Sequence, residues 1–258
     1  PQEAQGLSIW LEQKNAERQK LTEKTLAKAR EQILVQGIST LLIASDKDYS
    51  AGIMGLVASK LAEEFYRPAI VIRTGEQISS GSCRSIPEFN IILALNQCSR
   101  LLLEFGGHSQ AAGFILPTEN LPRLKQELLN LATTELVGVE LRPRLDIEAE
   151  VPLTDLSGGT FLAIQQLAPF GQGNPAPTFL SRGVGVIDCG TIGSSGGHLK
   201  LKLKQGGTVW DGVAFGLGNY LSEVSPMLDI VYNLEIDRWG GEERLRLNIL
   251  DFAPTNQN

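Results

Sequence analysis

The chain has 258 residues, of which 42% are hydrophobic and 20% are charged, and this composition argues against a disordered, collagen-like or low-complexity protein. The net charge of −6 argues against a protein coated with nonspecific nucleic-acid-binding charge, although it leaves room for a local basic groove. No apolar run approaches the ~20 residues that a membrane helix needs, so no membrane partner is expected.

The first half of the chain is predicted to be an α/β domain preceded by a long polar helix. Residues 7–36 have loosely helical spacing of apolar positions, and so polar a helix is expected to be a connector that occupies 1–37. Strands and helices then alternate, which predicts an α/β domain over 38–137. The expected strands are 39–44, 68–72, 78–85 and 111–116, and the expected helices are 52–65, 89–99 and 120–136.

The second half of the chain has a different sequence pattern. After a plausible linker at 138–144, glycine-rich turns separate short alternating segments, with one helix at about 158–167. Five or six strands with one helix predict an all-β barrel like the oligonucleotide-binding (OB) fold over 145–254. The expected strands are 145–151, 178–188, 198–204, 208–215, 229–236 and 243–251.

The three cysteines, Cys83, Cys98 and Cys189, form no Cys-x-x-Cys pair. A disulfide framework and a structural zinc site are therefore not expected, and the cysteines are predicted to be small buried hydrophobic residues. This cysteine usage, together with a start that lacks a basic-then-apolar signal segment, predicts a protein of the reducing cytoplasm.

The segment Phe105-Gly-Gly-His-Ser-Gln-Ala-Ala-Gly113 is the strongest local signal. The glycines Gly106 and Gly107 leave backbone amides open and allow a ligand to come close, with His108 as a donor. This pattern predicts a phosphate or anion pocket. A tight turn with a hydrogen-bonded histidine explains the same residues equally well.

Hydroxyl groups surround one arginine in Ser79-Ser-Gly-Ser-Cys-Arg-Ser-Ile-Pro87. Arg84 can bind a phosphate through two parallel hydrogen bonds, and Ser82 and Ser85 can add donors. The alternative is a polar loop with one surface arginine.

The segment His198-Leu-Lys-Leu-Lys-Leu-Lys204 alternates strictly, so Lys200, Lys202 and Lys204 share one face of a strand with His198. Such a basic stripe suits the phosphates of a single strand, and a merely solvated strand face is the alternative. Nearby aromatic side chains could stack on bases, but core packing is the favoured prediction for most of them. Trp239 is the best candidate for an exposed one. The four aromatic residues are Trp210, Phe215, Tyr232 and Trp239.

No complete catalytic constellation is present in the sequence. The chain has only two histidines, and the pair Asp46 and Asp48 is read as a turn because no third carboxylate or histidine lies nearby in sequence. No phosphate-binding P-loop, dinucleotide glycine motif or nucleophile elbow occurs. We therefore expect no metal site in this chain.

Taken together, these segments resemble the C-terminal half of the RecJ family, bacterial exonucleases specific for single-stranded DNA. The helix start Gly52-Ile-Met-Gly-Leu-Val-Ala-Ser59 is similar to that family's GxxGxxAS segment. The segments 82–87, 105–113, 167–177 and 197–201 follow its pattern in the same order. The Gly-Gly-His motif alone indicates only the domain associated with DHH-type phosphoesterases, but the Phe-Gly-x-Gly-Asn-Pro segment and the barrel make RecJ the specific match.

The resemblance implies a 5′→3′ exonuclease that hydrolyses single-stranded DNA in repair and recombination. In that family a preceding DHH domain supplies Asp and His ligands for two manganese or magnesium ions, which activate the attacking water. No such domain is visible here, so this chain alone is expected to bind DNA without cutting it. Single-stranded DNA is the expected partner, and a single-strand-binding protein is left open as a second one.

The same resemblance assigns roles to particular residues. It implies that His108, with Gly106 and Gly107, faces phosphate near the metal centre. Ser82 and Arg84 would hold a terminal 5′ phosphate or the neighbouring backbone. The long helix corresponds to the connector from the preceding domain, and the barrel would guide the strand.

One segment departs from the family, and two other functions stay open. The family often has Trp-His-Pro where this chain has Tyr49-Ser50-Ala51, which keeps an aromatic residue but loses the histidine. The first alternative is a RecJ-like protein without catalysis that serves as a DNA-binding scaffold. The second is a phosphoesterase of the same superfamily that acts on short oligonucleotides, although a strand-guiding barrel argues against it.

Overall fold

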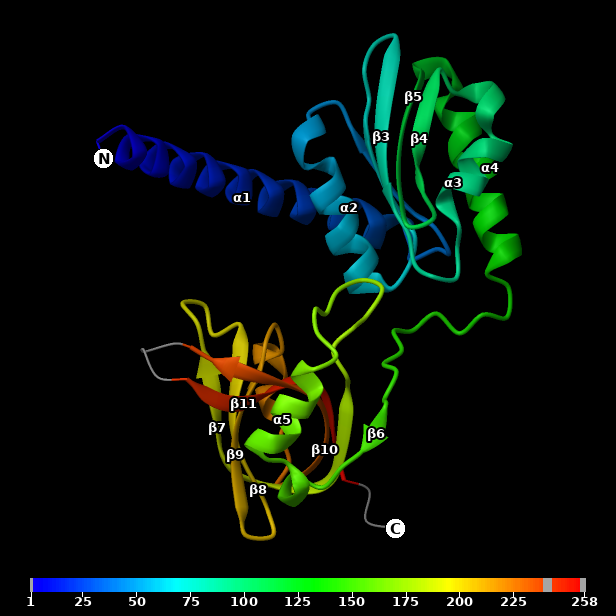
Figure 1. Ribbon diagram of the computed structural model, residues 1–258. Coiled ribbons are helices and arrows are strands. Elements are labelled where there is room, and N and C mark those ends of the chain that lie inside the picture. Colours follow the sequence, from blue (N-terminus) through cyan, green and yellow to red (C-terminus); the bar gives the residue numbers. More distant parts are fainter. Residues whose placement is uncertain (1, 239–242, 256–258) are drawn as a thin grey trace. The chain divides into compact units, whose positions relative to one another are not determined.

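The computed structural model describes residues 2–238 and 243–255, and the contacts divide the chain into two compact units, Pro1–Pro143 and Arg144–Asn258 (Figure 1). The domain limits expected from the sequence, 1–37, 38–137 and 145–254, stay predictions. Among the described residues, no helix combines the length and the apolar character that crossing a bilayer requires.

The first unit is built on a mixed five-stranded sheet with the strand order β1-β2-β3-β5-β4. Strands β1 and β2 are parallel, and the remaining neighbours are antiparallel. Its helices and strands, in chain order, are α1 (Gln2–Gln36), β1 (Leu42–Asp46), α2 (Ala51–Phe65), β2 (Ala69–Arg73), β3 (Ile78–Arg84), α3 (Ile91–Gln97), β4 (Glu104–His108), β5 (Ala111–Pro117) and α4 (Leu121–Glu135).

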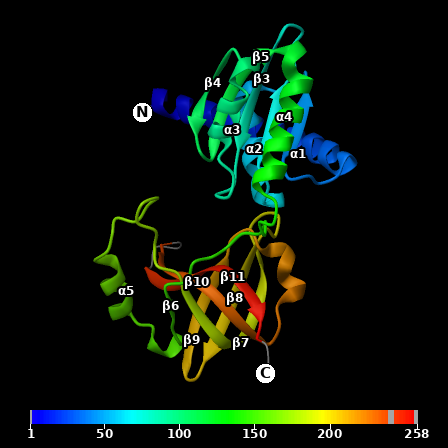
Figure 2. The same cartoon turned by 90° about the vertical axis from the view of Figure 1, so that its right-hand side faces the viewer.

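Helices cover both faces of this sheet (Figures 1 and 2). On one face, α2 and the C-terminal half of α1 enclose a core with β1 and β2, in which Ile33, Val57 and Val71 are buried. On the other face, α3 and α4 pack against β3 and β5, with Leu95 and Leu124 in the core. The first half of α1 is exposed along its length, as its polar sequence predicts.

The register between β3 and β5 depends on a glycine that lies opposite an aromatic ring. Gly81 pairs with Phe114, and a Cβ atom at position 81 would collide with the Phe114 ring. Residues 79, 81 and 83 of β3 therefore face the α3–α4 core, and residues 80, 82 and 84 face the opposite side.

Strand β4 is a departure from the sequence prediction, which gave an anion pocket or a tight turn, and no strand, at Phe105–His108. All five residues of β4 are exposed, and the strand forms the edge of the sheet by pairing with β5. Because it buries no apolar face and contains two consecutive glycines, it has neither the alternation nor the residue types that indicate a strand.

The second unit is a closed barrel of five strands (Figure 2). Antiparallel pairs join most neighbours, β9 and β11 are parallel, and pairing between β7 and β10 closes the barrel. The predicted fold class, an α/β domain followed by an OB-like barrel with an N-terminal helix, is confirmed. The elements are β6 (Ala149–Glu150), α5 (Gly158–Gln165), β7 (Phe179–Ile192), β8 (His198–Gln205), β9 (Thr208–Ala214), β10 (Met227–Asp237) and β11 (Arg244–Pro254).

The barrel core follows directly from the alternation along β8. Leu199, Leu201 and Leu203 are fully buried, and the lysines between them are exposed. Tyr232 of β10 is also fully buried, and its hydroxyl forms a 2.9 Å hydrogen bond with Ser181 of β7. A buried tyrosine with a satisfied hydroxyl belongs to the core, as predicted.

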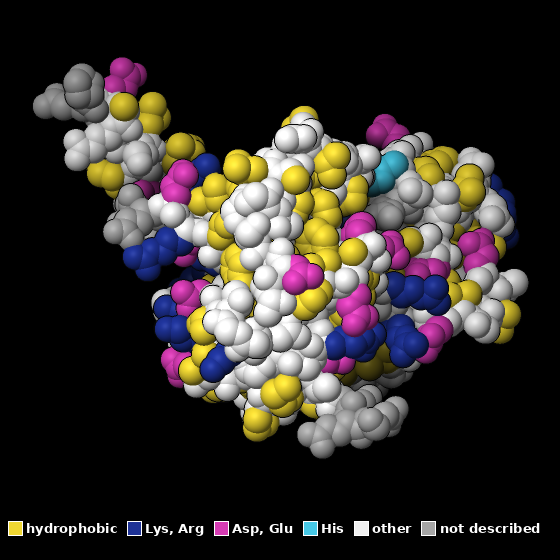
Figure 3. Space-filling model, turned by 60° about the horizontal axis from the view of Figure 1, so that its bottom comes forward, with side chains coloured by type: hydrophobic (Ala, Val, Ile, Leu, Met, Phe, Trp, Pro, Cys, Tyr) yellow, Lys and Arg dark blue, Asp and Glu magenta, His cyan; other side chains and the backbone are white. Residues whose placement is uncertain are grey.

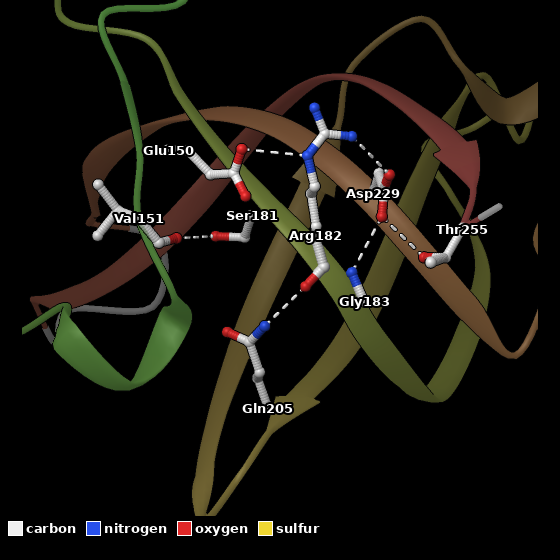
Figure 4. Close-up of polar contacts among 8 residues, drawn as sticks. All are labelled: Glu150, Val151, Ser181, Arg182, Gly183, Gln205, Asp229 and Thr255. Carbon is white, nitrogen blue, oxygen red and sulfur yellow. Dashed lines mark hydrogen bonds and ion pairs between the residues drawn. The ribbon is translucent and has the colours of Figure 1, made fainter. Parts of the chain in front are cut away.

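A network of hydrogen bonds and ion pairs lies at the seam of the barrel, which is the pairing of β7 with β10 (Figure 4). Arg182 lies between Glu150 and Asp229, with 3.1 Å contacts to both carboxylates. Asp229 also accepts hydrogen bonds from the Gly183 amide (2.9 Å) and the Thr255 hydroxyl (2.8 Å). Burial opposes ionisation of Asp229, but the Gly183 amide, the Thr255 hydroxyl and Arg182 outweigh it, so the pKa of this carboxyl is lowered.

Replacing Asp229 by Asn is expected to lower the free energy of unfolding of the barrel at pH 7 by about 1.5–3 kcal/mol, because charge-assisted hydrogen bonds are lost at the seam. Since folding lowers this pKa, the stabilisation is present above the pKa of the unfolded chain and is lost as pH falls through the folded value. The Asp229→Asn variant should therefore lose less stability than the parent between about pH 5 and pH 2.

Urea unfolding at several pH values, followed by tryptophan fluorescence, measures both effects. The control is Asp188→Asn, which neutralises an exposed aspartate on β7. Equal stability losses in the two variants at pH 7 would show that the seam network does not stabilise the barrel.

Candidate nucleic-acid interface

Pairing across three strands brings the two predicted phosphate-binding motifs together. Arg84 of β3 is paired with Ala111 of β5, which is paired with His108 of β4. Directly opposed residues point to the same face, and two strand spacings separate Arg84 from His108 by about 10 Å. The next row on this face is Ser82, Gly113 and Gly106, so small residues form its floor.

Helix α2 borders this row and makes room for the arginine. A Cβ atom on Gly55 would lie 2.9 Å from Arg84 Nη2 and 3.3 Å from Ser82 Oγ. A glycine inside a helix costs roughly 1 kcal/mol relative to alanine. Its position in the middle of the predicted helix was the available sign that α2 approaches another group closely there.

The guanidinium of Arg84 keeps donors available for a ligand. Its Nη1 donates to the Cys83 carbonyl oxygen at 2.8 Å and to Ser82 Oγ at 3.4 Å. Across residues 2–238 and 243–255, no carboxylate lies within 4.0 Å of this side chain. A half-buried cation without a carboxylate partner can bind an anion without first breaking an ion pair.

A cavity of about 550 Å³ opens beside the row. Arg84 and His108 line it together with Tyr66, which follows α2, and Pro87. The phenol of Tyr66 donates to the Glu88 carboxylate at 3.1 Å, which holds the aromatic ring at the rim. The sequence prediction did not include Tyr66, because nothing in its local pattern sets it apart from a core residue. The volume and the mixture of apolar walls with a few polar groups are typical of small-ligand sites.

His108 is exposed and can donate from one ring nitrogen. Its Nδ1 accepts a long, 3.4 Å hydrogen bond from the Gln110 amide, so the neutral ring carries its hydrogen on Nε2. Ser85 differs from its predicted role. It lines the cavity, but its hydroxyl donates to the Phe89 carbonyl oxygen at 2.6 Å. Its single hydroxyl hydrogen is therefore not available to a phosphate.

The lysine stripe on the barrel is less basic than its sequence indicates. Lys202 lies directly between Asp188 of β7 and Asp211 of β9, whereas Lys200 and Lys204 have uncharged cross-strand neighbours. Opposite charges at cross-strand positions attract each other and reduce the potential that a phosphate meets. The face drawn in Figure 3 likewise shows Lys and Arg side chains beside Asp and Glu side chains.

His198 shares a face of β8 with the lysines, but its ring is held in place. Its Nδ1 accepts a 2.9 Å hydrogen bond from the Gly216 amide, and its ring lies 5.3 Å from that of Phe215 at 70°. This half-buried histidine therefore fixes the turn after β9 through Nδ1.

The aromatic residues divide between core and surface. Trp210 is half-buried and donates to the Leu153 carbonyl oxygen at 3.2 Å, and Tyr232 is fully buried, as the core prediction requires. Phe215 is an exception to this core packing, because 51% of it is exposed. Trp239, the candidate for an exposed aromatic, lies outside the described residues.

The residues present do not fit a manganese or magnesium centre. In the part of the chain that the structure describes, no three His, Cys, Asp or Glu side chains cluster as metal ligands would. Asp46 binds Lys28 Nζ at 2.6 Å and accepts from the Asp48 amide, and these contacts, Lys28 first, hold the pKa of Asp46 below its ordinary value. This geometry is that of a turn closed by an ion pair.

The cysteines are mostly structural. Cys83 and Cys98 are buried, and burial raises the pKa of the Cys83 thiol to about 12. Cys189 is exposed on β7, contrary to the prediction that all three are buried. It belongs to a run of three exposed residues, 187–189, at the register shift between Val186 and Asp188, where the regular alternation of the strand is interrupted.

Comparisons with known proteins identify both units. The family model of the DHHA1 domain matches residues 31–134, and that of the RecJ OB domain matches residues 147–251. The chain is 32% identical over 256 residues to the single-stranded-DNA-specific exonuclease RecJ of Bacillus subtilis, covering 97% of this chain and 33% of that protein. It is 33% identical over 202 residues to the Thermus thermophilus RecJ, covering 78% of this chain and 29% of that protein.

Solved structures agree with this match. The crystal structure of Thermus thermophilus RecJ in complex with Mn²⁺ superimposes with a TM-score of 0.76 and 26% identity, over 98% of this chain and 37% of that one. The Mg²⁺ complex of the same protein gives a TM-score of 0.74 at 26% identity, over 98% and 38% of the two chains. The chain spans about a third of the length of these relatives.

The two neighbouring glycines of β4 are expected to respond differently to substitution. A Cβ atom at Gly107, where φ is +146°, would lie 2.5 Å from Ala112 Cα and would also collide with the Ala111 carbonyl oxygen, whereas Gly106 has open space. Gly107→Ala should therefore cost about 1–3 kcal/mol and lower the melting temperature by about 3–10 °C. Gly106→Ala should stay near the parent value in a thermal melt followed by circular dichroism. Equal melting temperatures for the two variants would contradict the register of β4 on β5.

Proposed function

Because the chain carries the DHHA1 and OB domains of the RecJ family, we propose that it is the substrate-binding part of a 5′→3′ exonuclease that degrades single-stranded DNA. The observation that carries this proposal is the row of Arg84, Ala111 and His108 beside a cavity, in which the Arg84 guanidinium has no carboxylate within 4.0 Å among the described residues. Phosphate recognition by a fork of parallel donors needs this kind of cation.

The first unit holds the end of the strand. The Arg84 guanidinium binds a terminal 5′ phosphate, Ser82 Oγ contributes a further polar contact, and His108 Nε2 donates to a phosphate oxygen. Gly106 leaves space above the floor, so the phosphate can approach the backbone. Ser85 supports the site through its hydrogen bond to Phe89 and takes no direct part.

The second unit guides the strand that leaves this end. Outer faces of OB barrels bind oligonucleotides, and Lys200 and Lys204 can contact phosphates from β8. The metal ions, manganese or magnesium, belong to a part of the enzyme outside this chain, since the described residues hold no cluster of metal ligands. The chain by itself binds a strand and leaves it intact.

A 5′ phosphate is expected to strengthen binding of a fluorescent ~20-nucleotide strand by about 10- to 100-fold over a 5′ hydroxyl, because bidentate charge-assisted hydrogen bonds contribute about 1.5–3 kcal/mol. Arg84→Ala should remove most of this preference. The matched control is Arg73→Ala, an exposed arginine at the other end of the same sheet. Fluorescence anisotropy at two salt concentrations measures the affinities, and equal affinity of the parent for both strand ends would contradict the proposal.

The three lysines of β8 are expected to contribute unequally. Each phosphate contact to a single strand adds about 0.7 to the slope of log affinity against log salt. Lys200→Ala and Lys204→Ala should reduce this slope by about that amount, and Lys202→Ala should reduce it less, because Asp188 and Asp211 flank it. The double variant Asp188→Asn, Asp211→Asn should increase affinity. A larger effect from Lys202 than from its neighbours would show that the flanking aspartates do not weaken the stripe.

A further inference from the structure

Phe215 is an exposed aromatic side chain whose ring is held in place by its neighbours. It follows β9 directly, and 51% of it remains exposed. The Arg246 guanidinium lies over the ring, 5.6 Å from its centroid, and the His198 ring lies 5.3 Å away at 70°. These contacts orient the ring and leave about half of the side chain exposed.

The two neighbours are themselves fixed. Arg246 on β11 contacts the Glu235 carboxylate at 2.6 Å and the Asp237 carboxylate at 3.0 Å, and it is only 20% exposed. His198 is fixed by its hydrogen bond from the Gly216 amide. A ring supported by such partners has little freedom left to lose when a ligand stacks on it, so less of the stacking energy is offset by lost entropy.

The charges around Phe215 favour a neutral, flat ligand over a phosphate. Arg246 is already paired with two carboxylates, so its charge is not free for a phosphate, which would also face Glu235 and Asp237. A nucleobase is uncharged, and its π face stacks on an aromatic ring regardless of sequence. The cation over Phe215 adds to the binding capacity of such a platform.

From this geometry we infer that Phe215 is a base-stacking platform of the barrel, on which one base of the bound single strand rests. This inference rests on the proposed function, because it takes the ligand to be single-stranded DNA. It assigns the barrel a contact that depends on bases and hardly on salt. The weakened lysine stripe of β8 makes such a contact more important to the affinity.

The test compares two strands with equal numbers of phosphates. One is a ~12-nucleotide oligothymidylate with a 5′ hydroxyl and a 3′ fluorophore, and the other is the same strand with abasic residues in place of the nucleotides. The parent should bind the natural strand at least 5- to 10-fold more tightly than the abasic one, as expected for stacking of a base on a half-exposed ring. Phe215→Leu should lose this part of the affinity, and Phe215→Tyr, which keeps a ring, should retain it.

A matched control separates stacking from a loss of surface or of fold. Ile187→Ala removes apolar surface from a side chain of equal exposure, 52%, on β7, and it should bind like the parent. Melting temperatures of all variants show whether the barrel is intact, and Phe215→Leu keeps most of the apolar volume.

Three results would overturn the stacking platform at Phe215. If Phe215→Leu binds both strands as the parent does, the platform is overturned while the proposed function stands. If Phe215→Tyr loses as much affinity as Phe215→Leu, stacking on the ring is likewise overturned. If the parent binds neither strand, nor the 5′-phosphorylated strand, the proposed function and the platform fail together.

Discussion

The register between β3 and β5 determines which side chains of the first unit reach the cavity. Gly81 lies under the Phe114 ring, and this close contact permits only one alignment of the two strands. A slip of one residue would turn Arg84 and Ser82 into the α3–α4 core and bring Cys83 to the open face. Burying the unpaired guanidinium would cost several kcal/mol, so the packing of a glycine against an aromatic ring protects the position of the binding residues.

The alternation of side chains predicted much of the fold, because burial and periodicity are linked there. The strict Leu–Lys alternation of β8 and the apolar runs of β1 and β2 indicate that these segments are strands and which of their residues are buried. Strand β4 could not be found in this way. It is an exposed edge whose pairing depends on β5 and on the positive φ of Gly107, and neither shows in its local sequence.

The sequence predicted which residue types belong to the candidate site, but it did not predict their contacts. Arg84 and His108 stand out in the sequence, and strand pairing brings them to one row. The ring of His198 and the charge of Lys202 have partners elsewhere in the chain: Gly216 after β9 and two aspartates on neighbouring strands. The partner of the Ser85 hydroxyl is the Phe89 carbonyl oxygen, only four residues away, but the residue types do not show that this contact forms. A local pattern carries no information on such partners, so it overestimates the number of groups available to a ligand.

The two units would bind a strand through different forces, and their balance determines where the strand is held. In the proposed arrangement, a terminal phosphate on Arg84 would contribute a charge-assisted contact that weakens as salt screens it. A base on Phe215 would contribute a stacking energy of similar size that salt hardly changes. At low salt the end of the strand is therefore favoured over its interior. As the salt concentration rises, the preference for a terminal phosphate would shrink and the stacking energy would stay nearly constant. Contacts along the strand would then contribute a larger share of the affinity. A protein that processes a strand from its end needs the first contact to exceed the second at its working ionic strength. Among the described residues no carboxylate lies within 4.0 Å of Arg84, whereas Arg182 and Arg246 of the barrel are paired with carboxylates, and this difference favours that order.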